Sequence, residues 1–286
     1  SPWVSKMTTL VKIVVMRGVI VSNGLKTMIP NMEKWVPLLC FSSPFLFSTP
    51  RTLEIDKVAE TVIRDHGAVP GFKGYNGFPA TLCVSVNEQV VHGIPTEEPF
   101  KEGDVISVDC GVYMNEFFGD SAYTFPIGEV SDEVMRLLKV TNTSLYKAID
   151  KALEGNRIGD IGHAVQYYAE RENNYGVVRE LVGHGIGRSL HEAPEVPNYG
   201  RKGNGPKINE GLVIAIEPMI NMGKRGIKHA EDGWTIITKD SQPSAHFEHT
   251  VAVGREQADI LSDHTLIEAA LEKNPNVQAV GTFSNI

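Results

Sequence analysis

The period of the hydrophobic positions predicts alternating helices and strands from about residue 52 to residue 273. Between 52 and 66 the apolar residues recur at close to helical spacing, and Gly67 ends that run. Further helices are predicted at 131–154, where Ser131 is the N-cap, and at 158–173 and 260–273. Alternating or β-branched runs predict strands at 82–86, 210–220, 234–238 and 245–253.

Composition and hydrophobic periodicity divide the chain into three parts. Residues 1–51 have no clear helical period and many prolines and β-branched residues, so we expect an atypical N-terminal segment of undefined structure. Its apolar stretches, 10–21 and 35–47, are interrupted by charges or prolines, and they fall short of the roughly 20 apolar residues of a membrane span. Neither has the form of a signal peptide. Residues 52–275 contain no low-complexity linker and are predicted to form one domain, followed by a tail at 276–286.

A predicted hairpin at 102–125 contains two aspartates that are unexpected in an apolar sheet. A turn centred on Met114 and Asn115 would place Asp109 directly across from Asp120, at the roughly 4.5–5.5 Å Cβ separation of cross-strand neighbours. Like charges in that position destabilise a sheet. Either a bound cation compensates for them, or one aspartate points to water and the turn is displaced by a residue.

The start of this hairpin has an internal echo. The segment from Glu102 to Asp109 aligns with the segment from Glu210 to Glu217, because both contain Glu-Gly, then Val-Ile, and a terminal carboxylate. We interpret the echo as two related halves in which Asp109 and Glu217 occupy equivalent places and face one another. The alternative is that two short apolar strands resemble each other by chance.

Composition and charge narrow the classes of function. The 286 residues are 42% hydrophobic and 22% charged, as in an ordinary globular protein. A net charge of -8 and the lack of a Lys/Arg cluster argue against a surface specific for nucleic acid or anionic membranes. Three cysteines, Cys40, Cys83 and Cys110, have no metal-knuckle spacing, which favours a reducing compartment such as the cytoplasm.

Four carboxylates and one imidazole stand out from the apolar strands around them. The imidazole, His184, lies between glycines 183 and 187 in what we expect to be a flexible loop. The acids are Asp109, Asp120, Glu217 and Glu248. Taken singly, each is most simply a solvated strand end. If the four converge, each pair about 4 Å apart repels by roughly 4 kcal/mol at an effective dielectric of 20, and two divalent cations would balance the charge.

Such a ligand set suits Mn, Fe(II), Co or Zn, and two ions of this kind form a hydrolytic centre with a bridging hydroxide as nucleophile. Glu217 is the acid best suited to pass a proton to a leaving amine. His92 and His191 are not needed as ligands and could instead donate hydrogen bonds to a scissile amide. The alternative for both histidines is a structural or merely exposed side chain.

The order and spacing of these motifs, from about residue 52 to 264, resemble those of the type I methionine aminopeptidases of the bacterial kind. The matching motifs include His92-Gly93-Ile94-Pro95, Gly183-His184-Gly185-Ile186-Gly187 and Phe247-Glu248-His249-Thr250. The resemblance implies an α+β pita-bread fold for the catalytic domain at 52–275, with two pseudo-symmetric halves and a central antiparallel sheet backed by helices.

The resemblance also implies roles for individual residues. Two divalent metal ions per chain would be bound by Asp109, Asp120, His184, Glu217 and Glu248, with Asp120 and Glu248 bridging. His191 would lie near the substrate's carbonyl oxygen and His92 near its amide nitrogen. The family's pocket for the methionine side chain maps onto Tyr75, Phe78, Cys83, Leu190 and Trp234, although core packing explains these five residues nearly as well.

The implied function is removal of the initiator methionine from nascent proteins whose next residue is small. The implied setting is a cytoplasmic monomer that meets its substrate at the ribosome, without nucleic-acid specificity or membrane attachment. One alternative is a proline-directed peptidase of the same fold, a prolidase or Xaa-Pro aminopeptidase, although these usually have a large N-terminal domain. A second is a catalytically silent pita-bread adaptor, which would be expected to have lost ligands that are all present here.

Overall fold

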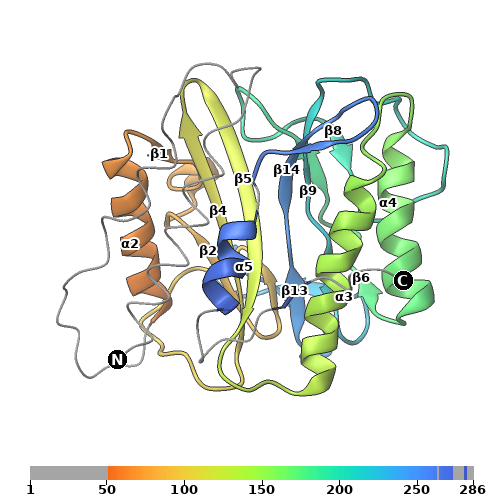
Figure 1. Ribbon diagram of the computed structural model, residues 1–286. Helices are drawn as coiled ribbons and strands as arrows, with labels where there is room; N and C mark the ends of the chain where they lie inside the picture. Colours follow the sequence, from red (N-terminus) through yellow and green to blue (C-terminus); the bar gives the residue numbers. More distant parts are fainter. Residues whose placement is uncertain (1–50, 263, 273–279, 282–286) are drawn as a thin grey trace.

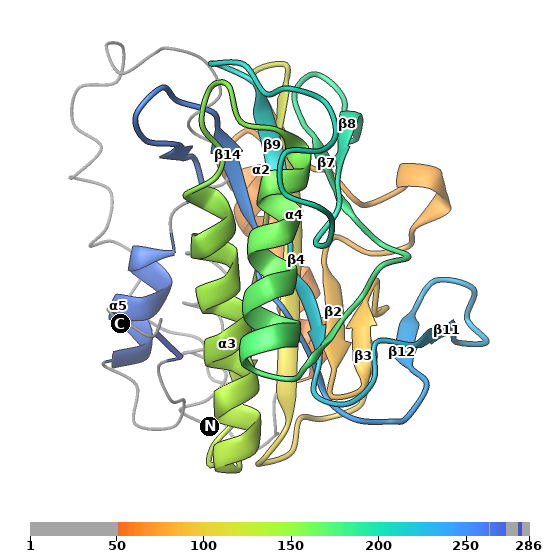
Figure 2. The ribbon, with the colours of Figure 1, turned by 90° about the vertical axis from the view of Figure 1, so that its right-hand side faces the viewer.

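Antiparallel sheets flanked by helices make up the computed structural model, which describes residues 51–262, 264–272 and 280–281. In Figure 1 the strands lie between α2 on one side and α3 and α4 on the other, and Figure 2 shows α3 and α4 side by side in front of the strands. The predicted N-terminal segment, apart from Arg51, lies outside the described residues, as does most of the predicted tail.

The helices agree in position with those predicted from the sequence. The α-helices are α2 (Thr52–Asp65), α3 (Asp132–Ile149), α4 (Ile158–Gln166) and α5 (Thr265–Glu272). A short 3-10 helix, η2 (Tyr75–Gly77), and a π-helical turn, η3 (Tyr167–Glu172), complete them. The predicted N-cap is confirmed, because the Ser131 hydroxyl accepts a hydrogen bond from the Val134 amide at 3.3 Å. The predicted C-terminal helix is shorter than expected, since it starts at Thr265 after a strand.

Fifteen strands form four sheets within the described residues. In chain order they are β1 (Val69–Pro70), β2 (Cys83–Val86), β3 (Gln89–Val91), β4 (Val105–Met114), β5 (Phe117–Pro126), β6 (Gly176–Val177), β7 (Gly183–Gly185), β8 (Glu192–Val196), β9 (Val213–Ile216), β10 (Met219–Asn221), β11 (Ile227–His229), β12 (Ile236–Thr238), β13 (Ser244–His246), β14 (His249–Ala252) and β15 (Asp259–Ile260). The sheets have the orders β1-β4-β2 with β5 on β4, β13-β10-β6, β11-β12-β3, and β15-β14-β9-β7-β8.

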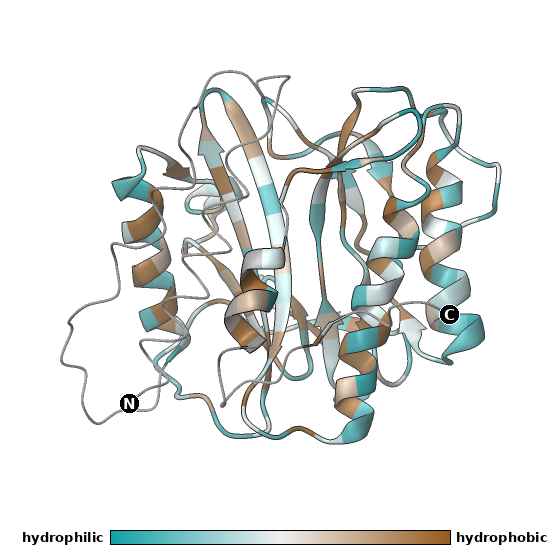
Figure 3. Ribbon diagram, viewed as in Figure 1, coloured by the Kyte–Doolittle hydropathy of each residue, from teal (hydrophilic) through white to brown (hydrophobic). Residues whose placement is uncertain are grey.

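Helix α2 shows how the layers are held together. Its residues Ile55, Ala59, Val62 and Ile63 are buried, and Figure 3 shows hydrophobic and hydrophilic faces around the helices that flank the sheets. The same helix buries a carboxylate. Asp56 Oδ1 accepts the backbone N–H groups of Thr81 and Leu82 at 2.9 and 2.8 Å, which ties the helix to the start of β2.

The hairpin that contains the two aspartates is confirmed, but its predicted register is wrong. The turn consists of Asn115 and Glu116, both with positive φ (50° and 69°), as a two-residue hairpin turn of the I′ type requires. Asp120 therefore pairs with Gly111, and Asp109 pairs with Ala122. The two carboxylates are diagonal neighbours on one face, because a shift of two residues preserves the alternation of faces.

The two segments that resemble each other in sequence, 102–109 and 210–217, also share a pattern of backbone hydrogen bonds. Gly103 N donates to Ile127 O at 2.7 Å, and Gly211 N donates to Val253 O at 2.9 Å. Both glycines have positive φ (91° and 83°) where they open the strands β4 and β9. The return bonds also match, because Ile127 N donates to Asp104 O and Val253 N donates to Leu212 O, each at 2.8 Å. The strand pairs β4–β5 and β9–β14 thus start in the same way.

Two predicted strands are each interrupted at an acidic residue. The stretch 210–220 forms β9 and β10 with Glu217 between them, and the stretch 245–253 forms β13 and β14 with Glu248 between them. Because β9 pairs with β14 while β10 pairs with β13, the two interruptions lie side by side. Both acids are therefore placed where neighbouring strands pass from one sheet to another.

We expect Asp56→Ala to lower the free energy of unfolding by about 1–3 kcal/mol, because it leaves two buried N–H groups without an acceptor. Asp56→Asn keeps the accepting oxygen. Burial raises the pKa of Asp56 above 3.8, so the stability contributed by Asp56 falls as pH rises through its folded-state pKa. The Asn variant lacks that part of the pH dependence and should lose less stability than wild type between pH 3 and pH 7. Urea titrations at pH 7 and pH 3 measure both effects.

The exposed Asp65→Ala, at the end of the same helix, is the control and should stay within about 0.5 kcal/mol of wild type. Equal destabilisation of the Asn and Ala variants at pH 7 would contradict the assignment of Asp56 as an acceptor.

Candidate functional site

Three of the predicted ligands meet inside the molecule. Asp120 comes from β5, His184 from β7, and Glu248 from the junction between β13 and β14. All three are buried, and each offers a ligand atom that lies within 4.8 Å of the others. The prediction that His184 lies in a flexible loop is wrong, because β7 is paired on both sides, with β8 and β9. The imidazole is held by a sheet.

Asp109 and Glu217 complete what we call the acid–histidine site, formed by Asp109, Asp120, His184, Glu217 and Glu248. Burial raises the pKa of Asp109 well above 3.8, and Asp120 and Glu217 raise it further. Burial also raises the pKa of Glu217 and of Glu248, each with a further contribution from Asp120. Burial raises the pKa of Asp120 to about 6. The acids therefore resist ionising together, which is the electrostatic problem that a cation solves.

The pattern of unpaired atoms fits a metal. Asp109 Oδ1 and Glu248 Oε1 are buried and have no hydrogen-bond partner among the described residues. A buried acceptor without a donor costs about 1–3 kcal/mol, and a divalent cation compensates such an oxygen directly. A set of carboxylate oxygens with one imidazole matches the preference of first-row divalent metals such as Mn, Fe(II), Co and Zn.

The tautomer of His184 supports the same conclusion. Its Nδ1 lies 2.8 Å from the carbonyl oxygen of Gly185, which can only accept, so Nδ1 is the donor. Burial lowers the pKa of His184 to about 4, and the neutral ring therefore has a lone pair on Nε2. Nε2 lies 3.7 Å from Glu217 Oε1. Two acceptors facing each other favour a cation between them.

Hydrogen bonds from neighbouring strands fix the backbone of these residues. The Thr250 hydroxyl donates to Asp120 O at 2.7 Å and accepts from Asp120 N at 3.0 Å. Ser121 Oγ donates to Glu248 O at 3.2 Å. Asn198 Nδ2 donates to Glu217 O at 2.9 Å. The backbone of each of these three acids is thus anchored by a side chain from another strand or loop, which limits the movement of its carboxylate.

The two remaining predicted histidines lie at the same site. The rings of His191 and His184 have centroids 4.3 Å apart, and His191 Nδ1 lies 2.8 Å from the Tyr75 hydroxyl. Burial lowers the pKa of His191, and burial together with the nearby His191 and His229 lowers that of His92 to about 4. Both rings are therefore neutral near pH 7, and each has one N–H to donate.

The five predicted pocket residues also come together. Phe78, Cys83 and Leu190 belong to a buried cluster against which Tyr75 and Trp234 pack, and we call these five residues the aromatic slot. The Phe78 and Trp234 rings meet edge to face with centroids 5.2 Å apart. Cys83 pairs with Asp109 across β2 and β4. The slot is therefore next to the acid–histidine site, and core packing still accounts for part of its contacts.

His246 is a site neighbour that the sequence reasoning missed. Its Nε2 lies 3.7 Å from Glu217 Oε2. One available signal was its position two residues before Glu248 in a predicted strand, since residues i and i+2 of a strand share a face. That signal is weak, because buried histidines without a function occur in the same position.

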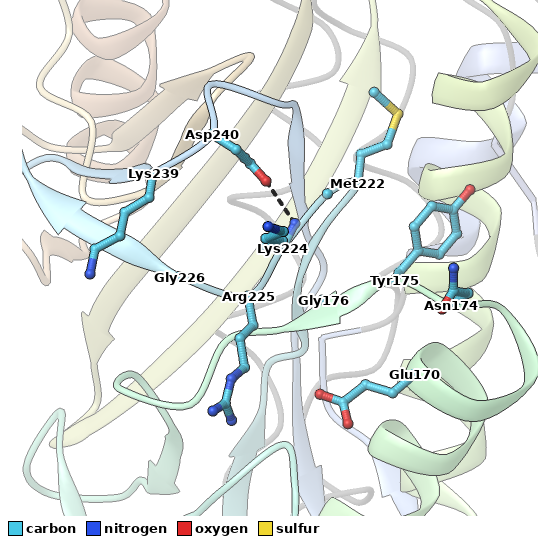
Figure 4. Close-up of a pocket in the computed structure, with 11 residues that line it drawn as sticks. Glu170, Asn174, Tyr175, Gly176, Met222, Lys224, Arg225, Gly226, Lys239 and Asp240 are labelled. Atoms are coloured by element: carbon cyan, nitrogen blue, oxygen red, sulfur yellow. Dashed lines mark hydrogen bonds between the residues drawn. The ribbon is translucent and has the colours of Figure 1, made fainter.

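A separate hollow of about 910 Å³ lies elsewhere and contains none of the predicted site residues. Figure 4 shows basic side chains of Lys224, Arg225 and Lys239 in it, together with the acids Glu170 and Asp240. Asp240 Oδ2 accepts the backbone N–H of Lys224 at 2.7 Å. Since acidic and basic side chains both line this hollow, it does not have the chemistry of the acid–histidine site.

No helix among the described residues is long and apolar enough to cross a bilayer.

Comparison with known proteins adds independent information. Residues 20–255 match the family model described as Metallopeptidase family M24. The methionine aminopeptidase of Clostridium perfringens is 51% identical over 211 residues, which cover 74% of this chain and 84% of that protein. Methionine aminopeptidase 1 of Bacillus subtilis is 50% identical over 211 residues, covering 74% and 85%.

The crystal structure of methionine aminopeptidase from Rickettsia prowazekii matches with a TM-score of 0.74 at 39% identity, covering 75% of this chain and 87% of that one. These likenesses confirm the predicted resemblance and the pita-bread fold. The family's use of divalent metal agrees with the buried cluster of Asp120, His184 and Glu248. Because the match to the family model spans residues 20–255 of the 286, the chain belongs to metallopeptidase family M24.

Proposed function

We propose that this protein removes the N-terminal methionine from polypeptides whose second residue is small. The observation that carries the proposal is the convergence of Asp120, His184 and Glu248 on one buried point. Relatives named methionine aminopeptidase at up to 51% identity support it, and so does the aromatic slot, because an apolar pocket with a thiol suits a thioether. The natural substrates would be nascent proteins at the ribosome, met by a cytoplasmic monomer.

Two divalent ions, Co, Mn, Fe(II) or Zn, fit the ligand set in this proposal. Asp109, Asp120, His184, Glu217 and Glu248 would hold them. Two ions would offset the four negative charges of the ionised acids, whose mutual repulsion contributes to the raised pKa of Asp109, Glu217 and Glu248. When bound, they supply Lewis-acid polarisation and activate water for attack on the peptide bond.

The protein's own side chains then bind, orient and transfer protons. The aromatic slot receives the methionine side chain and excludes water from it. His191 donates a hydrogen bond to the carbonyl oxygen of the scissile bond. His92, also neutral, lies near the scissile nitrogen, which can accept its N–H only after attack on the carbonyl has made that nitrogen pyramidal. Glu217 takes the proton released by the attacking water and passes it to the leaving amine. Hydrolysis consumes one water, and the products are free methionine and the shortened chain.

Removal of metal tests the proposal directly. We expect exhaustive chelation to abolish hydrolysis of a Met-Ala peptide, and added Mn²⁺ or Co²⁺ to restore it, because the carboxylates alone cannot activate water at neutral pH. Product release followed by chromatography measures this. An Xaa-Pro peptide serves as the comparison substrate.

Full activity after chelation would exclude the metal mechanism. Preference for Xaa-Pro over Met-Ala would favour the proline-directed alternative, and a chain that binds metal without hydrolysing either peptide would be the silent adaptor.

Glu217→Gln tests the proton shuttle. The amide keeps one oxygen for the metal but cannot carry a proton, so we expect metal content close to wild type and kcat lowered about 10²–10⁴-fold. Steady-state kinetics and metal analysis of the same sample give both values. Glu129→Gln, an exposed substitution, is the control for the mutation type. A kcat near that of wild type would contradict the role.

Tyr75→Phe tests how His191 is held. If His191 donates through Nε2, its Nδ1 must accept, and the Tyr75 hydroxyl at 2.8 Å is placed to donate to it. Loss of one such bond, worth about 0.5–1.5 kcal/mol, should lower kcat by about 2–10-fold, while the retained ring keeps KM close to wild type. Tyr167→Phe, at a residue that is 51% exposed, is the matched control. A raised KM with unchanged kcat would assign Tyr75 to the slot alone.

A further inference from the structure

A buried histidine that takes no part in the proposed mechanism faces the carboxylate of Glu217. His246 ends β13 and is only 2% exposed. Its Nε2 lies 3.7 Å from Glu217 Oε2 and has no hydrogen-bond partner among the described residues. An unpartnered polar atom in the interior is unfavourable, so the direction in which this ring points needs a physical reason.

The backbone of His246 is held rigidly. Its N–H donates to Thr124 Oγ1 at 3.0 Å, and the Thr124 hydroxyl donates to its carbonyl oxygen at 2.6 Å. Met219 pairs with it from β10, two residues after Glu217. The imidazole and the carboxylate are therefore placed by adjacent paired strands, and their approach is a property of the sheet.

The two oxygens of Glu217 face two different kinds of ring nitrogen. Oε1 lies 3.7 Å from His184 Nε2, which has a lone pair because Nδ1 donates to Gly185 O. That side favours a cation. Oε2 lies 3.7 Å from His246 Nε2, which has no hydrogen-bond partner among the described residues. That side favours an N–H donor.

We propose that His246 Nε2–H donates a hydrogen bond to Glu217 Oε2 and thereby positions this carboxylate, leaving Oε1 directed toward His184 and the metal. His246 is thus a positioning residue for the proton shuttle. The separation of 3.7 Å exceeds a hydrogen bond by about half an ångström, so the proposed bond requires the Glu217 carboxylate to move toward His246 by that amount. This inference rests on the proposed function, because it assigns Glu217 to the metal side.

The experiment compares three variants at this position. His246→Leu removes the donor, His246→Asn has an amide that stops short of Glu217, and His246→Gln has an amide N–H that reaches the place of Nε2. Isothermal titration of each metal-free protein with Mn²⁺ gives the affinity without any assay of activity. Steady-state kinetics on a Met-Ala peptide give kcat and KM separately. His163→Leu, on the distant helix α4, is the histidine control.

We expect the Leu and Asn variants to bind Mn²⁺ about 10–100-fold more weakly than wild type, as loss of a partner to a metal ligand typically does. Their kcat should fall by a similar factor, with KM close to wild type. The Gln variant should recover most of both quantities. If His246→Leu does not fold, as judged by thermal denaturation, the contrast between Asn and Gln decides alone.

Wild-type Mn²⁺ affinity in the Leu and Asn variants would overturn the inference. Equal weakening in the Gln variant would also overturn it, because the effect would not depend on a donor at that place. A wild-type protein that binds Mn²⁺ but does not hydrolyse Met-Ala would refute the proposed function, while the order of metal affinities among the variants would still test the role of His246.

Discussion

The strongest constraint on this structure is the repulsion among acidic side chains that the fold gathers in its interior. Burial raises the pKa of Asp109, Glu217 and Glu248 well above ordinary values, and other acids of the site raise each one further. Two unit charges 4 Å apart repel by about 4 kcal/mol at an effective dielectric of 20. A typical domain is stable by only about 5–15 kcal/mol, so the surrounding architecture must hold these groups firmly.

Paired strands supply that hold, and the acids lie where the pairing changes. β9 runs beside β14, and β10 runs beside β13, while Glu217 and Glu248 occupy the two gaps between these pairs. One bond spans the gap, from Phe247 N to Pro218 O at 3.4 Å. Because regular pairing resumes immediately on both sides, the interruption releases the two side chains toward the site without loosening the sheet.

Much of this arrangement could be predicted from the sequence, because its signals are local. The helical spacing of the apolar residues predicted the helices, and the acids that interrupt apolar strands predicted the acid–histidine site. The hairpin register was wrong because Glu116 adopts a positive φ of 69°, which is unusual for that residue type. The strand β7 was missed because it has only three residues, two of them glycines, and glycine is depleted in strands. His246 was missed because no local pattern separates a functional buried histidine from a structural one.

The same hydrogen-bond pattern occurs where β4 and β9 begin. The acid–histidine site lies between these two segments, which are far apart in the chain. β4 and β5 contribute Asp109 and Asp120, and the later strands contribute Glu217 and Glu248. If an ion is bound between them as proposed, it acts as a cross-link that exists only in the native state. Occupancy is therefore thermodynamically linked to global unfolding: cation at 100 times its dissociation constant adds about 2.7 kcal/mol. Loss of the metal would thus lower the free energy of unfolding as well as abolish the activity.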